Sequence, residues 1–298
     1  RFAMQDKPDK TVLIIGCGDI GRRVAARLLE QGRAVTGMVR SEASAMAVRA
    51  SGAHGMRIDL DSDTPPDGCC SGFSEVYYFA PPPREGDTDE RLGHCLAQFD
   101  AGPPPRRIVY ISTSAVYGDC DGAWITEAQP VAPTTARGRR RLDAETRLHA
   151  WTQARGTDLV ILRVPGIYGP GKLPLSRLEQ GLPVLRESEA PWTNRIHADD
   201  LAAICIAAMQ ADRPDEVYNV SDGHPSNMTD YFFRVADAAG LPRPPEVAME
   251  EAARVLSPGM MSFLQDSRRM KNDKLLRELD IILQYPDLDA GLKSCFRG

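Results

Sequence analysis

Short runs of apolar residues alternate with amphipathic segments through the first half of the chain. The apolar runs are rich in Val, Ile and Leu and predict strands, whereas the intervening segments carry apolar residues at helical spacing. Short apolar strands separated by helices are typical of a parallel sheet covered on both faces, so we predict an α/β fold with a doubly wound sheet. The predicted strands are Val12–Ile15, Ala34–Val39, Gly55–Ile58, Val76–Phe79, Ile108–Ser112 and Leu159–Val164, and the predicted helices are Ile20–Gln31, Ser44–Ala50, Thr88–Phe99 and Thr135–Ala154.

The pattern changes after Val164, where prolines at positions 165, 170, 174, 183 and 191 interrupt a segment with little periodicity. Proline lacks the backbone N–H that regular elements need. Further elements are predicted at Asp200–Met209, Val217–Val220, Thr229–Ala239 and Asn272–Leu279. We therefore predict a first domain of residues 4–165, to which 194–222 return, and a smaller C-terminal substrate lobe of residues 166–193 and 223–298.

The first predicted strand runs directly into a Gly-x-Gly-x-x-Gly turn, and a helical pattern then continues to Gly32. In such a turn the first glycine permits the tight bend, the second lets a pyrophosphate approach the backbone, and the third lets helix and strand pack closely. The N–H groups at the helix N-terminus then face the phosphates. We predict a Rossmann-type dinucleotide site here, with a glycine-rich turn that binds nothing as the alternative. Its residues are Gly16, Gly18, Asp19, Ile20 and Gly21.

Arg40, at the end of the second predicted strand, bears on which dinucleotide binds. An acidic residue about 20 residues past the glycines would accept the ribose 2′-hydroxyl of NAD. A guanidinium instead matches the 2′-phosphate of NADP in charge and shape, so we expect NADP in preference to NAD, unless Arg40 only faces water. Other cofactor contacts are expected where the third and fourth strands end, at Asp59 and Leu60 and at Ala80 and Pro81.

Composition and charge narrow the function classes. The chain has 298 residues, of which 42% are hydrophobic and 26% charged, and its net charge of −5 argues against a nucleic-acid or membrane partner. No apolar stretch approaches the ~20 residues of a membrane span. The seven cysteines are scattered, which predicts reduced thiols, a cytoplasmic protein and no metal site. Residues 1–3, which precede Met4, are expected to be the remnant of an expression tag.

Four further motifs resemble those of a known family. They are Ile108-Val-Tyr-Ile-Ser112-Thr113-Ser114-Ala-Val-Tyr117-Gly118, Leu162-Arg163-Val-Pro165-Gly166-Ile-Tyr168-Gly169, Arg195-Ile-His197-Ala-Asp199-Asp200 and Val217-Tyr218-Asn219-Val220. With the glycine turn, they make the chain similar to the extended short-chain dehydrogenase/reductases, or NAD-dependent epimerase/dehydratase family. The resemblance implies a two-lobed enzyme acting on nucleotide sugars or other hydroxyl and carbonyl compounds. It also implies a nicotinamide near the fifth and sixth strand ends, with Pro165 as a contact.

The same resemblance implies a catalytic Ser/Thr, Tyr and Lys, in which the lysine lowers the pKa of the tyrosine that moves a proton. Thr113 matches the Ser/Thr position. The next family pattern is Tyr-Gly-x-Ser-Lys-Leu-x-x-Glu. It corresponds here to residues 137–145, where Gly138, Leu142 and Glu145 fix the register. Arg137 therefore stands at the tyrosine position and Arg141 at the lysine position. Extended members of the family usually carry Gly-x-x-Gly-x-x-Gly, whereas this chain has Gly-x-Gly-x-x-Gly. Together, the two departures resemble the atypical branch of the family.

The exchange changes the chemistry, because a guanidinium stays protonated and cannot trade a proton as a phenol does. Arg137 could polarise a carbonyl or hold an anion, and with its arginine neighbours it could form a clamp for a phosphorylated substrate. A solvated helix face is the alternative. Tyr117, Tyr168 and His197 are candidates to replace the lost phenol, although each also fits a framework role.

The sequence leaves two functions open. The first is an NAD(P)-dependent oxidoreductase or epimerase acting on a small hydroxyl or carbonyl compound, which is a nucleotide sugar in many relatives. The second is a non-catalytic NADP-binding sensor that regulates a partner; a scaffold with a vestigial site is a weaker third. Arg195 resembles a position near substrate phosphates but could equally pair with Asp199 or Asp200. A homodimer is possible through the long helices of the sheet.

Overall fold

The computed structural model describes residues 11–62 and 66–296, so the expected tag remnant at residues 1–3 lies outside the described part. The chain divides into two compact units. The first runs up to Ile111 and also holds Asp143–Ile161 and Cys205–Glu216. The second holds Ser112–Leu142, Leu162–Ile204 and the described chain from Val217 onward. The predicted domain of residues 4–165 with 194–222, and the predicted lobe of residues 166–193 and 223–298, stay a prediction.

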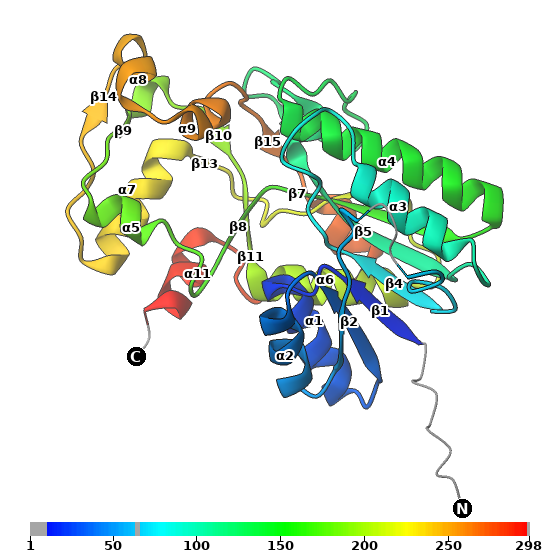
Figure 1. Ribbon diagram of the computed structural model, residues 1–298. Helices are drawn as coiled ribbons and strands as arrows, with labels where there is room; N and C mark the ends of the chain where they lie inside the picture. The colour runs from blue at the N-terminus through cyan, green and yellow to red at the C-terminus, as the bar shows by residue number, and fades with distance from the viewer. Residues whose placement is uncertain (1–10, 63–65, 297–298) are drawn as a thin grey trace, which may run out of the picture. The chain divides into compact units, whose positions relative to one another are not determined.

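The main sheet has seven strands in the order β12-β7-β5-β4-β1-β2-β3 and confirms the predicted doubly wound α/β fold (Figure 1). The chain steps outward from β1 to β3, then returns beside β1 with β4, so the strand order reverses between β1 and β4. Ligands of such sheets bind where the order reverses. The strands are β1 (Val12–Ile15), β2 (Val35–Val39), β3 (His54–Arg57), β4 (Glu75–Tyr78), β5 (Arg107–Thr113), β7 (Asp158–Val164) and β12 (Val217–Asn219).

Parallel pairing explains why the strands read as continuous apolar runs. Val12 of β1 pairs with Val35 of β2 on one side and with Glu75 of β4 on the other, and all four residues of β1 are fully buried. A strand covered on both faces has no polar side. The predicted strands consequently agree with the observed ones to within one residue at nearly every end.

The helices of the sheet follow their predicted patterns. α1 (Asp19–Glu30) buries Val24 and Leu28 on one face. It ends at Gly32, whose φ of +73° suits the left-handed residue that closes a helix, and Arg33 N–H donates to Leu28 O at 2.9 Å. The other helices are α2 (Glu42–Ala50), α3 (Glu90–Phe99), α4 (Ala136–Arg155) and α6 (Ala198–Gln210). Trp151 of α4 packs against Phe99 of α3 with ring centroids 5.6 Å apart.

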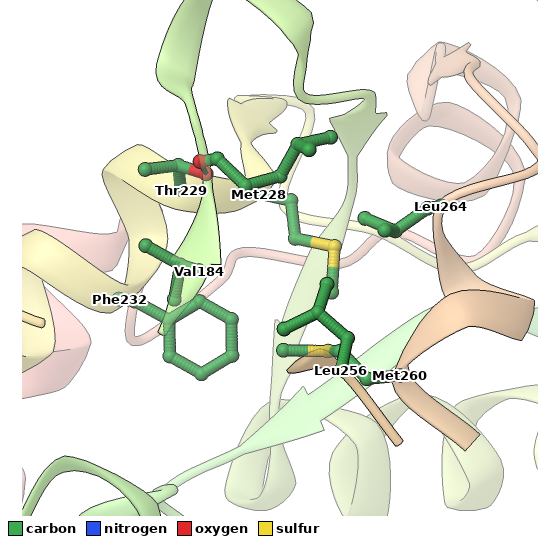
Figure 2. A pocket seen from close by; sticks show the side chains of 8 residues that line it. Val184, Met228, Thr229, Phe232, Leu256, Met260 and Leu264 are labelled. Carbon is green, nitrogen blue, oxygen red and sulfur yellow. Dashed lines mark hydrogen bonds between the residues drawn. The ribbon is translucent and has the colours of Figure 1, made fainter. Parts of the chain in front are cut away.

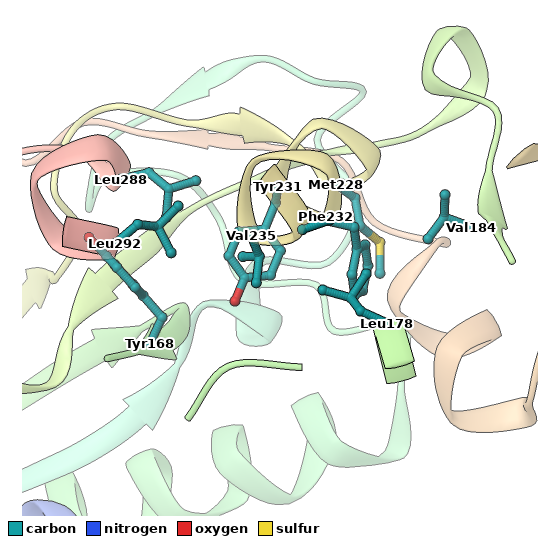
Figure 3. Close-up of a cluster of buried hydrophobic side chains, with 10 residues drawn as sticks. Tyr168, Leu178, Val184, Met228, Tyr231, Phe232, Val235, Leu288 and Leu292 are labelled. Atoms are coloured by element: carbon teal, nitrogen blue, oxygen red, sulfur yellow. The ribbon is translucent and has the colours of Figure 1, made fainter. Parts of the chain in front are cut away.

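The second unit adds short strands and helices around its own core (Figure 1). Its main cluster joins Tyr168, Tyr231 and Phe232 with aliphatic residues of α7 and α11 (Figure 3). The strands are β6 (Trp124–Ile125), β8 (Gly166–Tyr168), β9 (Val184–Leu185), β10 (Trp192–Thr193), β11 (Arg195–His197), β13 (Ser226–Asn227), β14 (Glu246–Val247) and β15 (Arg269–Met270). The helices are η1 (Ser114–Tyr117), α5 (Leu175–Glu179), η2 (Glu187–Glu189), α7 (Met228–Ala239), α8 (Met249–Val255), α9 (Pro258–Phe263), α10 (Asp273–Glu278) and α11 (Leu288–Cys295).

The helices α6, α7 and α10 and the strand β12 confirm the elements predicted for this half, whereas α8, α9 and α11 were not predicted. From Pro242 onward, the only element predicted was the helix at Asn272–Leu279. α11 is short, but Asp287 caps it by accepting from Ala290 N–H at 2.8 Å, and Leu288 and Leu292 bury its apolar side. Its stability therefore comes from tertiary packing, which a short window of sequence does not reveal.

All seven cysteines are free thiols in this structure, and the sulfurs of Cys69 and Cys70 lie 3.7 Å apart. Within the described residues, no helix is both long and apolar enough to cross a membrane. Nor do three or more His, Cys, Asp or Glu side chains of those residues gather as metal ligands.

Candidate functional site

The three glycines of the turn in the first unit differ in what surrounds them. A Cβ on Gly16, which has φ +80°, would overlap the backbone nitrogen of Ala80 and lie 2.6 Å from its Cα. A Cβ on Gly21 would lie 3.1 Å from Cγ2 of Ile14, so this glycine lets α1 approach β1. A Cβ on Gly18 would meet nothing within 4 Å. Two glycines thus serve close packing, and the third faces open space.

The open position coincides with the start of α1. Gly18 is exposed and stands at the N-cap of the helix, where no side chain accepts from the first turn. Backbone N–H groups at an uncapped helix N-terminus bind phosphate oxygens well. The open side of Gly18, next to the reversal of strand order between β1 and β4, therefore fits the diphosphate of a dinucleotide. Asp19 is engaged by Arg23, whose Nε lies 3.1 Å from its carboxylate, and Ile20 is half-buried.

Arg40 follows β2 and is strongly exposed, with 69% of its side-chain surface accessible. Its Nη1 lies 3.5 Å from Oδ2 of Asp61. Asp61 is bound more closely by Arg91, whose Nη2 donates to it at 2.7 Å and whose hydrogen bonds hold the pKa of Asp61 below its usual value. Because most of its side-chain surface is exposed, the guanidinium of Arg40 is accessible to a ligand anion.

The other predicted cofactor residues of this unit lie just past their strands. Asp59 is exposed and accepts from Asp61 N–H at 3.0 Å, whereas Leu60 is buried. Ala80 is buried against Gly16, and Pro81 is exposed. The carbonyl of Pro81 accepts from Arg91 Nη1 at 2.9 Å, so the same arginine ties the ends of β3 and β4 together.

In the second unit, Thr113 ends β5 and is half-buried. Its hydroxyl oxygen accepts from Ala115 N–H at 3.2 Å and so caps the turn η1. A hydroxyl that accepts from the backbone can still donate its own hydrogen. Thr113 can therefore both stabilise the strand end and hold a substrate oxygen.

Tyr117 and Tyr168 occupy framework positions. The Tyr117 hydroxyl donates to Asn219 Oδ1 at 2.6 Å, and the residue is almost fully buried. The Tyr168 hydroxyl donates to the carbonyl of Asp287 at 3.1 Å, and its ring lies in the core of Figure 3. Burial raises the pKa of Tyr168 well above its ordinary value. Burial therefore favours the framework role that sequence reasoning held as the alternative for both tyrosines.

His197 is also interior. Its Nδ1 accepts from Asp199 N–H at 3.1 Å, so Nε2 carries the hydrogen and donates to Ser294 Oγ at 3.0 Å. The ring stacks on Tyr285 with centroids 3.8 Å apart. Protein groups therefore engage both ring nitrogens of this buried imidazole. Pro165, which follows β7, is half-buried.

Arg137 lies in the first turn of α4, next to Gly138. A Cβ on Gly138 would come within 2.7 Å of Ala115 O, so the start of α4 packs directly against η1. Arg137 is half-buried, and its guanidinium carbon lies 4.3 Å from the ring centroid of Phe263. Arg141, one turn later, is also half-buried. The predicted register therefore brings Arg137 near the segment that follows Thr113.

Arg268 is a charged neighbour of Arg137 that sequence reasoning did not identify. Its Nη1 donates to Gly118 O at 2.8 Å and lies 3.3 Å from Asp266 Oδ2, while Nη2 donates to Ser114 Oγ at 3.3 Å. It comes from a loop far along the chain, just before β15. Only the doublet Arg268-Arg269 marked it in the sequence, and charged doublets are too common to single out a site.

A hollow among the packed helices of this unit is apolar (Figure 2). It is too tight to admit a water molecule, and no charged residue lines it. It therefore belongs to the core and is no candidate for ligand binding. Its lining residues are Val184, Leu185, Met228, Thr229, Phe232, Leu256, Met260 and Leu264.

The sheet order and the glycine turn define a dinucleotide-binding α/β protein. The chain belongs to the NAD dependent epimerase/dehydratase family, whose sequence pattern matches residues 12–221. Protein YeeZ of Escherichia coli strain K12 is 28% identical over 290 residues, covering 93% of this chain and 97% of YeeZ. The structure of a functionally unknown conserved protein from Silicibacter pomeroyi DSS is 34% identical with a TM-score of 0.80, covering 96% of this chain and 98% of that one. MoeE5 in complex with UDP-glucose and NAD shares the fold, at 22% identity and a TM-score of 0.74 over 96% and 97% of the two chains.

Proposed function

We propose that the protein is an NADP-dependent oxidoreductase or epimerase that acts on a small hydroxyl or carbonyl compound. The observation that carries this proposal is the contrast among the three glycines of the turn. Gly16 and Gly21 are closed by neighbouring atoms, while Gly18 opens onto free space at the start of α1. The backbone N–H groups at the uncapped start of α1 border this space and can donate to phosphate oxygens.

The first unit supplies the residues that would hold the diphosphate, the adenine and the 2′-phosphate. Residues 16–21 would hold the diphosphate, Asp59 and Leu60 would lie by the adenine, and Arg40 would bind a 2′-phosphate. NADP is favoured over NAD because Arg40 is exposed and cationic at the position where a carboxylate would accept the 2′-hydroxyl of NAD. A bound nicotinamide would supply or accept a hydride.

Thr113 and Arg137 would act on the substrate. Thr113 would donate its hydroxyl hydrogen to the substrate oxygen. Arg137 would stabilise negative charge that develops on that oxygen, because its guanidinium is a fixed cation with several donors. It would not exchange a proton, so the oxygen would gain or lose its proton through water. We expect slow turnover with a weak pH dependence between about pH 6 and 9, in contrast to a tyrosine whose pKa is tuned toward neutrality.

The cofactor part is tested by titrating the protein with NADPH and following nicotinamide fluorescence. Gly18→Val should abolish binding, because the added methyl groups would fill the open side of the turn. Ala26→Val is the control, since it places the same β-branched side chain at an exposed position of α1 and should bind NADPH like the wild type. Equal affinity of Gly18→Val and wild type would refute the placement of the diphosphate.

A non-catalytic NADP sensor is the second candidate. It is favoured by the interior positions of Tyr117, Tyr168 and His197, which leave no phenol or imidazole in an obvious proton-transfer position. The two functions are separated by steady-state absorbance measurements with NADPH and a panel of ketones, aldehydes and nucleotide sugars. Nucleotide sugars belong in that panel because MoeE5, which shares the fold, is found with UDP-glucose. Reproducible turnover would exclude a purely sensory role, and tight binding without turnover would favour it.

A further inference from the structure

The second unit holds more buried positive charge beside η1 than its carboxylates neutralise. Arg268 is paired with Asp266 and also bonded to Gly118 and Ser114. Asp266 is fully engaged, because its Oδ1 accepts from the Thr134 hydroxyl at 2.6 Å while its Oδ2 faces Arg268. This carboxylate pairs directly with Arg268, and a second guanidinium nearby is affected by its charge only at longer range.

Arg137 is that second guanidinium. Among residues 11–62 and 66–296, no carboxylate lies within ion-pair distance of it, and its Nε is buried without a hydrogen-bond partner. The Nε of Arg268 is likewise buried without a partner. Phe263 covers Arg137 on one side. A half-buried cation that faces an aromatic ring and lacks a counterion is costly unless something else neutralises it.

Electrostatics agree with this geometry. Burial lowers the pKa of Arg137, and among the neighbouring charges Arg268 lowers it most. Two arginines that repel each other gain from an anion that contacts both. The nearby backbone does not supply the missing partner, because the N–H of Gly138 already donates to Thr135 Oγ1 at 3.1 Å. The free donors at this place are side-chain N–H groups.

We propose that Arg137 and Arg268 bind an anionic group of the substrate, a carboxylate or a phosphate. The inference rests on the proposed function and narrows it, because the substrate becomes an anionic hydroxyl or carbonyl compound. Guanidinium groups suit both anions, since their paired N–H groups match two oxygens at once. Arg137 then has two tasks: it neutralises the anionic group and holds the reacting end beside Thr113.

The test uses the full chain without cofactor and measures binding by isothermal titration calorimetry. The probes are inorganic phosphate, lactate and propane-1,2-diol, of which the last resembles lactate but has no charge. Phosphate and lactate distinguish the two anion classes, and the diol should not bind. Arg137→Gln should weaken binding of the preferred anion by about tenfold or more, as loss of a hydrogen bond to a charged group does. Arg139→Gln removes the same charge from an exposed position of the same turn and should change affinity by less than about twofold.

If Arg137→Gln and Arg139→Gln weakened anion binding equally, the proposal would be overturned. The anions would then respond to the general positive charge of the helix and not to a specific site. No difference between lactate and the diol, together with no phosphate binding, would also overturn it. NADPH affinity of each variant is measured in parallel. If NADPH binds but the anions do not, the anion site is wrong and the proposed cofactor function stands. If the anions bind through Arg137 but NADPH does not, the anion site stands and its assignment to a redox substrate is overturned.

Discussion

The guanidinium carbon of Arg195 lies 3.7 Å from the ring centroid of Tyr231, so this arginine is stacked inside the second unit and does not face a ligand. Its Nε is buried without a hydrogen-bond partner, and burial lowers its pKa. Asp200, one of the partners expected for it, instead accepts from the backbone N–H groups of Gln284 and Tyr285. The Tyr231 ring is thus the contact that holds Arg195. Asp222 is the carboxylate that raises the pKa of Arg195.

Asp222 should make the stability of the protein depend on pH. The residue is buried, its Oδ1 accepts from His224 N–H at 2.8 Å, and its Oδ2 has no partner. Burial raises the pKa of Asp222 to about 7. Between the unfolded pKa of about 4 and this value, the folded state keeps a proton that the unfolded state releases, so stability falls as pH rises through that range and is constant above it.

Asp222→Asn removes this titration and keeps the acceptor for His224. We expect the free energy of unfolding at pH 8 to rise by about 2 kcal/mol relative to wild type, and the difference to shrink toward zero near pH 4. Urea unfolding at pH 4.5, 6 and 8 measures it. Asp212→Asn, at an exposed position, is the control and should leave the pH dependence unchanged. The assignment would be contradicted if stability rose from pH 5 to pH 8 by the same amount in the wild type, in Asp222→Asn and in Asp212→Asn.

The same substitution should destabilise the protein much more at Gly16 than at Gly18. Gly16→Ala places a methyl group into the backbone of Ala80 at a φ of +80°, and we expect a loss of about 2–4 kcal/mol. Gly18→Ala adds the methyl where nothing lies within 4 Å, so the loss should be less than about 1 kcal/mol. The midpoints of urea unfolding compare them directly. Similar losses in both would mean that the turn has a different conformation.

Arg40→Asp should change which dinucleotide is preferred. A carboxylate would repel the 2′-phosphate of NADP and could accept from the 2′-hydroxyl of NAD, so we expect the NADP/NAD affinity ratio to fall by about 10-fold to 100-fold. Fluorescence titration with NADPH and NADH gives the ratio. Arg213→Asp makes the same charge change at an exposed position after α6 and should alter both affinities little. An unchanged ratio in Arg40→Asp would show that this side chain only faces water.

The first half of the fold was predictable because its signals are local. β1 is apolar at every position because it is buried on both faces, and α1 carries its apolar stripe and Gly32 within one short window. The glycine turn was equally predictable, since Gly16 and Gly21 stand where a Cβ would meet neighbouring atoms, and the spacing of the glycines expresses this requirement. The predicted positions of Thr113 and Arg137 followed from family motifs, and the structure puts them on elements that pack through Gly138 and Ala115.

The rest of the site depends on contacts between distant segments. Arg268 reaches Ser114 and Gly118 from a loop near the end of the chain, and nothing in its own neighbourhood signals this. The environment of Tyr168 was hidden for the same reason, because Asp287 and Leu292 bury it from α11 and the residue before that helix. A tyrosine in a loop motif and one in a core look alike in sequence.

The last prediction concerns Tyr168, which is a framework residue in one interpretation and a proton donor in the other. Tyr168→Phe removes one hydrogen bond to Asp287 O and keeps the ring in the core, so we expect a stability loss of about 1 kcal/mol and turnover or NADPH affinity within about twofold of wild type. A Cβ on Gly291 would overlap the Tyr168 hydroxyl and lie 2.5 Å from its Cε2, so Gly291→Ala should be far more destabilising. Combining the two substitutions relieves the overlap with the hydroxyl and should recover part of that loss. If Tyr168→Phe instead abolished turnover while leaving stability and NADPH affinity intact, the tyrosine would be a proton donor and its framework role would be wrong.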